Sequence, residues 1–306
     1  MRDELRRGLL AAQKTLPSSL LYDALGSVLF EAITELPEYE VARADLRVLS
    51  EHARDAMPFL EKRVDVVELG PGHGRKARVV LAEVQRRQSQ VDFVAIDVAA
   101  AALEGCKRQL EDMEGVKVTG VEDTFIAGLR RAPRFAPRRL VLFLGSNLSN
   151  FDRRESLAFF NDVRATMEPG DALLLSADLE KPPAQLLPAY DDALGVTAAF
   201  NRNLLVRLNR EYRADFDVSA FAHEVRWNAE PRRIEMHLRA TRACEVSIPG
   251  LELSVRFAAN ETVWTESSHR FNVNELNDWG REARFSTAAT WVDRVWPLAL
   301  TLFIAQ

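Results

Sequence analysis

The sequence contains little cysteine and no long apolar run. Cys106 and Cys244 are the only cysteines among 306 residues, and neither belongs to a Cys-x-x-Cys pair. This pattern predicts neither a zinc site nor a disulfide framework. No run of about 18 apolar residues suggests a membrane span, and the first residues mix acids with bases, unlike a secretory signal. We therefore expect a cytoplasmic protein that uses no metal.

The chain also lacks a concentration of charge of one sign. Its formal net charge is -5, and its 40 Lys and Arg residues are scattered through the sequence. A short basic stretch at residues 130–139 is better explained as a solvated loop than as an RNA contact. Nucleic-acid-binding proteins usually carry a basic stripe, so we expect a small-molecule partner and neither nucleic acid nor membrane. The composition, 47% hydrophobic and 28% charged, is that of an ordinary soluble globular protein, and we expect a monomer.

The middle of the chain alternates apolar strands with amphipathic helices. Buried strands are predicted at residues 64–70, 91–98, 139–146 and 171–179, with a short strand at 116–120. Runs with apolar residues three and four positions apart separate them, which is helical spacing. This alternation is typical of a parallel sheet covered by helices on both faces. We therefore predict an α/β fold with a doubly wound, Rossmann-like domain.

The alternation stops at the sequence EKPP, residues 180–183. Two helix-like runs, at 184–195 and 196–212, precede strand-like runs whose polarity alternates with a period of two. A last helix and two strands are expected to return to the first sheet. The predicted domains are residues 44–181 with 270–306, and, as a second α+β domain, residues 1–43 with 182–269.

A glycine-rich turn follows the first predicted strand, in the sequence ELGPGHGRK. Gly70, Gly72 and Gly74 are spaced GxGxG, whereas the NAD fingerprint requires its third glycine where Arg75 stands. The GK[ST] ending of a phosphate-binding P-loop is also missing. Glu68, at the end of the strand, would repel a pyrophosphate but suits a cation. S-adenosylmethionine (SAM) is such a ligand, because it carries an ammonium and a sulfonium and no phosphate.

Two further regions follow the next strands. Asp97 ends the second strand, where an acid can bind both ribose hydroxyls of either SAM or NAD. The sequence VEDTF, residues 121–125, offers an acid and an aromatic ring that suit an adenine. In order, at the ends of three successive strands, these features favour SAM as the cofactor. The alternative is a plain tight turn with solvated acids.

Seven longer stretches follow one another over nearly the whole chain: YDALGSVLFEAITELPEYE, ELGPGHGRK, LVLFLGSNLSNF, YDDALGVTAAFNRNLL, ADFDVSAFAHEVRWN, RRIEMHLRA and TESSHRF. In this order they resemble the histidine Nα-methyltransferases of ergothioneine biosynthesis. The resemblance implies a class I SAM-dependent methyltransferase domain with a second, substrate-binding domain. It also implies that the α-amino group of L-histidine is methylated three times with SAM as donor, which gives the betaine hercynine.

The same resemblance implies Gly70, Lys76 and Asp97 as SAM contacts. The acid and the second glycine of the turn add Glu68 and Gly72 to the expected donor site. Asp123 and Phe125 are expected at the adenine, although a gapless comparison puts Thr124 in the place of the acid.

The resemblance further implies a substrate site, which uses three of the four tyrosines in the chain. Asn150 and Tyr190 are expected to bind the carboxylate of the amino acid, while Glu266 and Ser268 read its imidazole. The remaining implied contacts are Tyr39 at the ring, Tyr22 and Gly145 near the amine, and Phe30 and Met236 as pocket walls. Tyr22, Gly145 and Asn150 are the residues expected to serve catalysis.

Other interpretations accompany these assignments. Asn150 would also suit the N-cap of a helix that starts near Asp152, and the tyrosines would suit a hydrophobic core. The sequence departs from the family pattern at Asn147, where Thr is usual, and at Glu40, where LPEYEVAR replaces LPEYYPTR. Alternative functions are a related enzyme acting on another amine such as tryptophan, a SAM-binding protein without catalysis, and a nucleic-acid methyltransferase.

Overall fold

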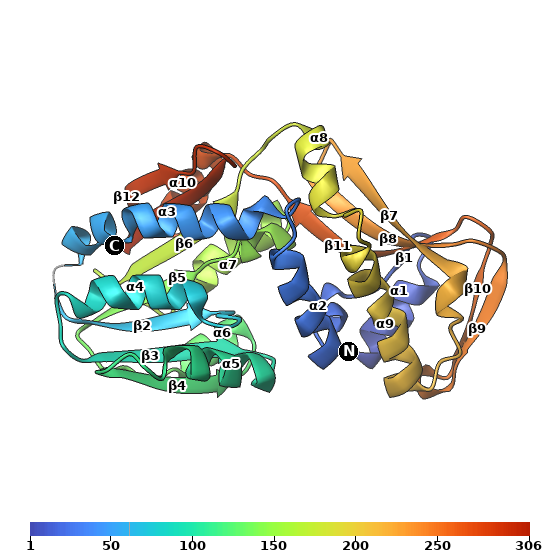
Figure 1. Ribbon diagram of the computed structural model, residues 1–306, viewed down its shortest axis with the longest axis horizontal. Coiled ribbons are helices and arrows are strands. Elements are labelled where there is room, and N and C mark those ends of the chain that lie inside the picture. Colours follow the sequence, from blue (N-terminus) through green and yellow to red (C-terminus); the bar gives the residue numbers. More distant parts are fainter. Residues whose placement is uncertain (61) are drawn as a thin grey trace. The chain divides into compact units, whose positions relative to one another are not determined.

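The structure is a computed structural model that describes residues 1–60 and 62–306 (Figure 1). The chain forms two compact units. One comprises Met1–Glu40 with Lys181–His269, and the other comprises Val41–Glu180 with Arg270–Gln306. The boundaries predicted from the sequence follow residues 43, 181 and 269. That the larger unit binds SAM and the smaller unit binds the substrate stays a prediction.

The larger unit contains a seven-stranded sheet in the order β12-β13-β6-β5-β2-β3-β4. Its strands are β2 (Val64–Leu69), β3 (Val91–Asp97), β4 (Val116–Glu122), β5 (Arg138–Phe143), β6 (Ala172–Asp178), β12 (Phe285–Val292) and β13 (Leu298–Ala305). Strands β2 to β6 pair in parallel, while β13 runs antiparallel to both β6 and β12. The predicted doubly wound α/β fold is therefore confirmed, with the last two strands returning to the sheet.

The central strands of this sheet are buried and mostly apolar, whereas the edge strands β4 and β12 are only partly buried. Every residue of β2 and every residue of β6 is buried. Helices α4 (Arg75–Gln85) and α5 (Ala100–Leu110) lead from β2 outward to β4, while α6 (Phe125–Arg131) and α7 (Arg153–Arg164) lead back through β5 to β6. Because parallel crossovers are right-handed, the two pairs of helices cover opposite faces of the sheet.

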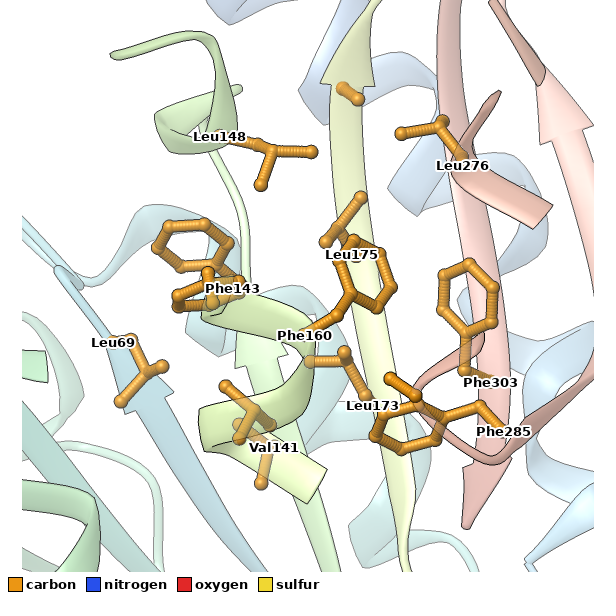
Figure 2. Packing of buried hydrophobic residues seen from close by; sticks show 14 of the residues in the cluster. Leu69, Val141, Phe143, Leu148, Phe160, Leu173, Leu175, Leu276, Phe285 and Phe303 are labelled. Atoms are coloured by element: carbon orange, nitrogen blue, oxygen red, sulfur yellow. The ribbon is translucent and has the colours of Figure 1, made fainter. Parts of the chain in front are cut away.

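One core of the larger unit involves the sheet and helices α6, α7 and α10 (Val273–Glu282). Phe160 of α7 meets Phe303 of β13 edge to face, with ring centroids 5.3 Å apart. Phe143, Leu175 and Leu276 belong to the same cluster (Figure 2). Burial of each such side chain is worth about 1.5–3 kcal/mol, so this core holds the strands that carry the ligand-binding loops.

The strand order of the sheet reverses at β2, which lies between β3 and β5. In doubly wound folds, ligands bind at the carboxyl ends of the strands where the order reverses. The glycine turn after β2 and the loop after β5 lie at this position, and helix α3 (Glu40–Ala56) reaches the same loop through a hydrogen bond from Gly145 to Asp45.

The smaller unit contains a four-stranded sheet in the order β1-β11-β8-β7, and a separate strand pair. The strands are β1 (Lys14–Thr15), β7 (Phe221–Asn228), β8 (Arg233–Ala240), β9 (Cys244–Ile248), β10 (Leu253–Phe257) and β11 (Thr262–His269). The helices are α1 (Arg2–Leu10), α2 (Ala24–Thr34), α8 (Pro183–Leu186) and α9 (Val196–Tyr212). Helix α9 packs against α2 and against β7 and β8, so it covers one side of the sheet.

Two predicted elements differ from the structure. Residues 184–195 do not form one helix, because Pro188 lacks the N–H that a continuing helix needs; α8 is followed by a 3₁₀ turn at Leu187–Ala189 and an irregular segment. The predicted strand at 139–146 ends at Phe143. Gly145 and Ser146 adopt left-handed backbone conformations, with φ of 81° and 57°, which are incompatible with an extended strand.

Candidate functional site

The glycine turn after β2 needs all of its glycines. Gly70, Gly72 and Gly74 have φ of 71°, 53° and 77°, in the left-handed region that favours glycine. A Cβ atom on Gly70 would lie 3.0 Å from Nδ2 of Asn147, and one on Gly74 would lie 2.8 Å from Sγ of Cys106. The turn therefore lets α4 begin close against its neighbours, and no side chain caps the N-terminus of that helix.

Glu68 is a buried acid directly before this turn. Its side chain is fully buried, and neither carboxylate oxygen has a hydrogen-bond partner in the described part of the chain. Burial raises the pKa of Glu68 to about 8; nearby Lys76 opposes this shift, whereas Asp45 and Asp97 add to it. A buried carboxyl group without a hydrogen-bond partner can bind a cationic ligand, because the nearby positive charge favours the ionised carboxylate.

Asp45 connects Lys76 with the loop after β5. Its Oδ2 atom accepts a hydrogen bond from the backbone N–H of Gly145 at 2.6 Å and lies 3.4 Å from Nζ of Lys76. Glycine is favoured at position 145 as well, because its φ of 81° is in the left-handed region. The sequence analysis missed Asp45; its one signal is an acid beside Ala44 on the buried face of α3.

The predicted ribose and adenine residues follow β3 and β4. Asp97 and Glu122 are register partners, so these strand ends are adjacent. Burial raises the pKa of Asp97, whose Oδ1 atom accepts the backbone N–H of Ala99 at 2.9 Å. Asp123 forms an ion pair of 2.6 Å with Arg131. Both carboxylates have protein partners in this structure, and their predicted contacts with SAM stay predictions.

Phe125 lies beside the glycine turn. Its Cε1 atom would be 3.3 Å from a Cβ atom on Gly70, and its ring meets that of Phe143 edge to face at 5.4 Å. Asn147 approaches Gly70 from the loop after β5. The structure therefore brings Gly70, Phe125 and Asn147 together. Asn147, one of the departures from the family pattern, is part of this arrangement.

The loop after β5 ends in an exposed asparagine. Ser146 fastens the loop to the sheet, because its Oγ atom accepts the backbone N–H of Asp178 at 2.8 Å. Asn150 is exposed at the end of the short 3₁₀ turn Asn147–Asn150. The N-cap of α7 is Asp152, which forms a capping box with Glu155. The interpretation of Asn150 as that N-cap is therefore wrong.

In the smaller unit, the tyrosines singled out in the sequence gather around Phe30. The ring of Phe30 lies 5.6 Å from that of Tyr22 and 6.2 Å from that of Tyr39. Tyr39 in turn lies 6.3 Å from Tyr190. Segments far apart in the sequence thus form one aromatic cluster with hydroxyl groups on three of its members.

Glu266 on β11 has one of these tyrosines as its partner. The Tyr22 hydroxyl donates a hydrogen bond to the carboxylate of Glu266. Desolvation raises the pKa of Glu266 to about 7, and the hydrogen bond from Tyr22 limits that rise. Glu266 also faces Met236 across the β11–β8 pair. The structure therefore joins Tyr22, predicted near the amine, to the residue predicted at the imidazole.

Tyr190 and Ser268 form a second hydrogen-bonded pair, with 2.7 Å between their hydroxyl oxygens. Both side chains are buried. Glu266 and Ser268 are two residues apart on β11 and so share a face of the sheet, as the sequence predicts. Four of the side chains predicted to contact the amino acid, namely Tyr22, Tyr190, Glu266 and Ser268, thus form two hydrogen-bonded pairs within one unit.

Within residues 1–60 and 62–306, no helix is long and apolar enough to span a membrane. The same residues contain no group of three or more His, Cys, Asp or Glu side chains placed to hold a metal ion.

Comparisons with known proteins cover nearly the whole chain. A family model described as "Histidine-specific methyltransferase, SAM-dependent" matches residues 1–304. The histidine N-alpha-methyltransferase of Mycolicibacterium smegmatis is 39% identical over 99% of this chain and 94% of its own length. The protein of the same name from Mycobacterium tuberculosis is 40% identical over the same shares. Ergothioneine biosynthesis protein 1 of Neurospora crassa is 30% identical over 64% of this chain and 23% of its own.

Solved structures match less closely. A SAM-dependent methyltransferase from Clostridium acetobutylicum aligns with 90% of this chain and 97% of its own at a TM-score of 0.49 and 11% identity.

Proposed function

We propose that this chain, which belongs to the family of histidine-specific, SAM-dependent methyltransferases, transfers three methyl groups to the α-amino group of L-histidine and forms hercynine. In a cell, this reaction would serve ergothioneine biosynthesis. The observation that carries the proposal is the pair of hydrogen bonds Tyr22–Glu266 and Tyr190–Ser268, which joins the side chains expected to read histidine. The family match does not favour another amine, such as tryptophan, as the acceptor.

The glycine turn and its acids suit SAM as the methyl donor. SAM supplies an electrophilic methyl group on a sulfonium when it is bound. The proposed contacts are Glu68, Gly70, Gly72, Lys76, Asp97, Asp123 and Phe125. The unpartnered oxygens of Glu68 support a cationic ligand rather than a phosphate, because a nearby cation favours the ionised carboxylate.

The proposed amino-acid site divides its work among polar groups. Asn150 and Tyr190 would bind the carboxylate, and Glu266 and Ser268 would bind the imidazole. Tyr39, Phe30 and Met236 would surround the substrate. Glu266 accepts an N–H that an aliphatic side chain lacks, and a site built for such a polar group rejects substrates that leave it unpaired.

The residues around the amine would act by orientation. Methyl transfer to nitrogen is an in-line displacement, for which positioning alone can lower the barrier by roughly 7–11 kcal/mol. Tyr22, Gly145 and Asn150 are the proposed catalytic residues. The amine attacks only when neutral, so it must lose a proton before each transfer, and the Tyr22 hydroxyl is the proposed group that orients it. Solvent would receive the proton.

We further propose that the chain acts as a cytoplasmic monomer on a small molecule, without a metal and without nucleic-acid or membrane partners. The chemistry supports the absence of a metal, because a sulfonium donor needs no Lewis acid. Activity that survives a metal chelator, and a monomer mass on size-exclusion chromatography with light scattering, are the expected results.

The test of the function is direct. The purified chain is incubated with SAM and each of a panel of amino acids, and the products are examined by mass spectrometry. Three added methyl groups on L-histidine, with none on tryptophan or on an amino-acid-free control, are expected. Methylation of another amino acid in preference to histidine would reject the proposal.

A further inference from the structure

A buried asparagine joins two parts of the proposed amino-acid site. Asn201 lies on α9 and is fully buried. Its Nδ2 atom donates to the backbone carbonyl of His237 at 3.0 Å and lies 2.9 Å from Nδ1 of His223. Its Oδ1 atom accepts the hydroxyl of Thr265 at 2.7 Å. Both N–H groups and the oxygen of this amide are therefore used.

These contacts determine which nitrogen of His223 carries the proton. The carbonyl of His237 can only accept, so Nδ2 of Asn201 must face it, and the second N–H then points to Nδ1 of His223. Nδ1 is thus an acceptor and Nε2 carries the proton. Nε2 lies 2.8 Å from the backbone carbonyl oxygen of Tyr190 and donates to it. Burial lowers the pKa of His223, which keeps this ring neutral.

The other end of the network lies at an irregularity in β11. The pairing of β11 with β8 shifts between Trp264 and Glu266, so Thr265 is the extra residue of a bulge. Bulges change the direction of neighbouring side chains and often lie beside functional sites. The Thr265 hydroxyl is also 3.0 Å from the carbonyl oxygen of Met236, the register partner of Glu266. The hydrogen bond to Asn201 therefore holds Thr265, the bulge residue that sets the direction of the Glu266 side chain.

We propose that Asn201, His223 and Thr265 are positioning residues that set the separation between Tyr190 and Glu266 and thereby the preference for an imidazole amino acid. At one end of the network, His223 contacts the backbone of Tyr190. At the other end, Thr265 forms the bulge before Glu266. The substrate itself would contact Tyr190 and Glu266 and none of the three positioning residues. This inference rests on the proposed function, because it takes Tyr190 and Glu266 as histidine contacts.

The first test removes one hydroxyl without changing the size of the side chain. Thr265→Val should raise KM for histidine about tenfold, the effect of one lost buried hydrogen bond. The value of kcat at saturating histidine and Kd for SAM should stay within about twofold, and Thr265→Ser should restore wild-type KM. Thr262→Val is the matched control, because Thr262 is a buried threonine on the same strand outside the network.

The second test measures coupling through Asn201. His223→Leu removes the donor to Tyr190, whereas His223→Gln keeps an N–H at a similar position and should be milder. Thr265 and His223 both act through Asn201, so the double variant His223→Leu with Thr265→Val should raise KM by less than the product of the single effects. If the two substitutions instead damaged the structure independently, their separate increases in KM would multiply.

The outcomes separate this inference from the proposed function. Failure of the wild-type chain to methylate histidine would reject the proposed function. A wild-type chain active on histidine, with Thr265→Val equal to Thr262→Val in KM and in the ratio of rates for histidine and other amino acids, would overturn the positioning network. A double variant whose increase in KM equals the product of the two single increases would also overturn the positioning network. Thr265→Ala, with the same expected KM, replaces the valine variant if thermal unfolding shows that the latter does not fold.

Discussion

The hydroxyl oxygen of Tyr190 lies 2.7 Å from that of Ser268, although the two residues are 78 positions apart in the sequence. Tyr190 is proposed to hold the carboxylate of histidine and Ser268 its ring. Their hydrogen bond means that the two ends of the amino-acid site are not independent. A change at one hydroxyl removes a partner from the other, and both groups are buried.

Tyr190→Phe is therefore expected to raise KM for histidine about tenfold, since a buried hydroxyl loses its partner. The affinity for SAM, measured by calorimetry, should not change. Tyr212→Phe is the matched control, because Tyr212 is the fourth tyrosine of the chain and ends helix α9. Equal KM values for the two variants would contradict a role for the Tyr190 hydroxyl.

Glu266→Ala should lose most of the histidine affinity, by about tenfold to a hundredfold, because hydrogen bonds to charged groups contribute about 1.5–3 kcal/mol. Binding of SAM should survive, which isothermal titration measures separately. Glu261→Ala serves as the control: Glu261 lies near the start of β11 and pairs with Lys14. Loss of both ligands in the Glu266 variant would show misfolding, and the assignment would not stand.

Tyr22→Phe should move the pH dependence of histidine methylation. The pKa of Glu266 is raised to about 7 by burial, and the hydrogen bond from Tyr22 opposes that rise. Removal of this hydrogen bond disfavours the ionised form, so the pKa of Glu266 should rise further. The acid limb of kcat/KM plotted against pH is expected to shift to higher pH. An unchanged profile, with unchanged kcat and KM, would remove both the orienting and the electrostatic role of Tyr22.

Local patterns in the sequence were sufficient to predict the parallel sheet and the glycine turn. Four apolar strands and one short strand, separated by helical runs, leave few alternatives to a doubly wound fold. The glycine turn can be predicted because its backbone has positive φ angles at Gly70 and Gly74, and such angles favour glycine over other residues. The prediction of one helix at residues 184–195 is wrong, because Pro188 interrupts the run.

Contacts between distant segments could not be predicted from local patterns. Asp45 accepts a hydrogen bond from the N–H of Gly145, which is 100 positions away, and no residue near Asp45 in the sequence indicates that partner. The Thr265–Asn201 contact depends on a bulge, whose position follows from the pairing of β11 with β8 rather than from the alternation of residues. Long-range register is decided by packing, so it requires the structure.

Asp45→Asn should weaken SAM binding about tenfold, because Lys76, a proposed SAM contact, loses the carboxylate that holds its Nζ atom at 3.4 Å. The asparagine oxygen can still accept the N–H of Gly145, so the loop after β5 should stay folded. Asp55→Asn, on the exposed side of the same helix, is the control. Calorimetric titration with SAM checks the expectation, and equal affinities in the two variants would show that Asp45 has only a structural role.

Glu68→Gln tests the buried acid before the glycine turn through the stability of the ligand-free chain. The pKa of Glu68 is about 8 in the folded chain against an ordinary value of 4.5. Between these values the unfolded chain has released a proton that the folded chain retains, so stability falls as pH rises from 4.5 to 8, by at most about 1.4 kcal/mol per pH unit. Glutamine cannot ionise and removes this loss. Thermal unfolding should therefore give similar midpoints for both chains near pH 4.5 and a higher midpoint for the variant at pH 8 and above. The variant should also bind SAM more weakly, because it cannot present a negative charge to the cation. Parallel stability curves across this range would mean that Glu68 is solvated and ionised in the free protein.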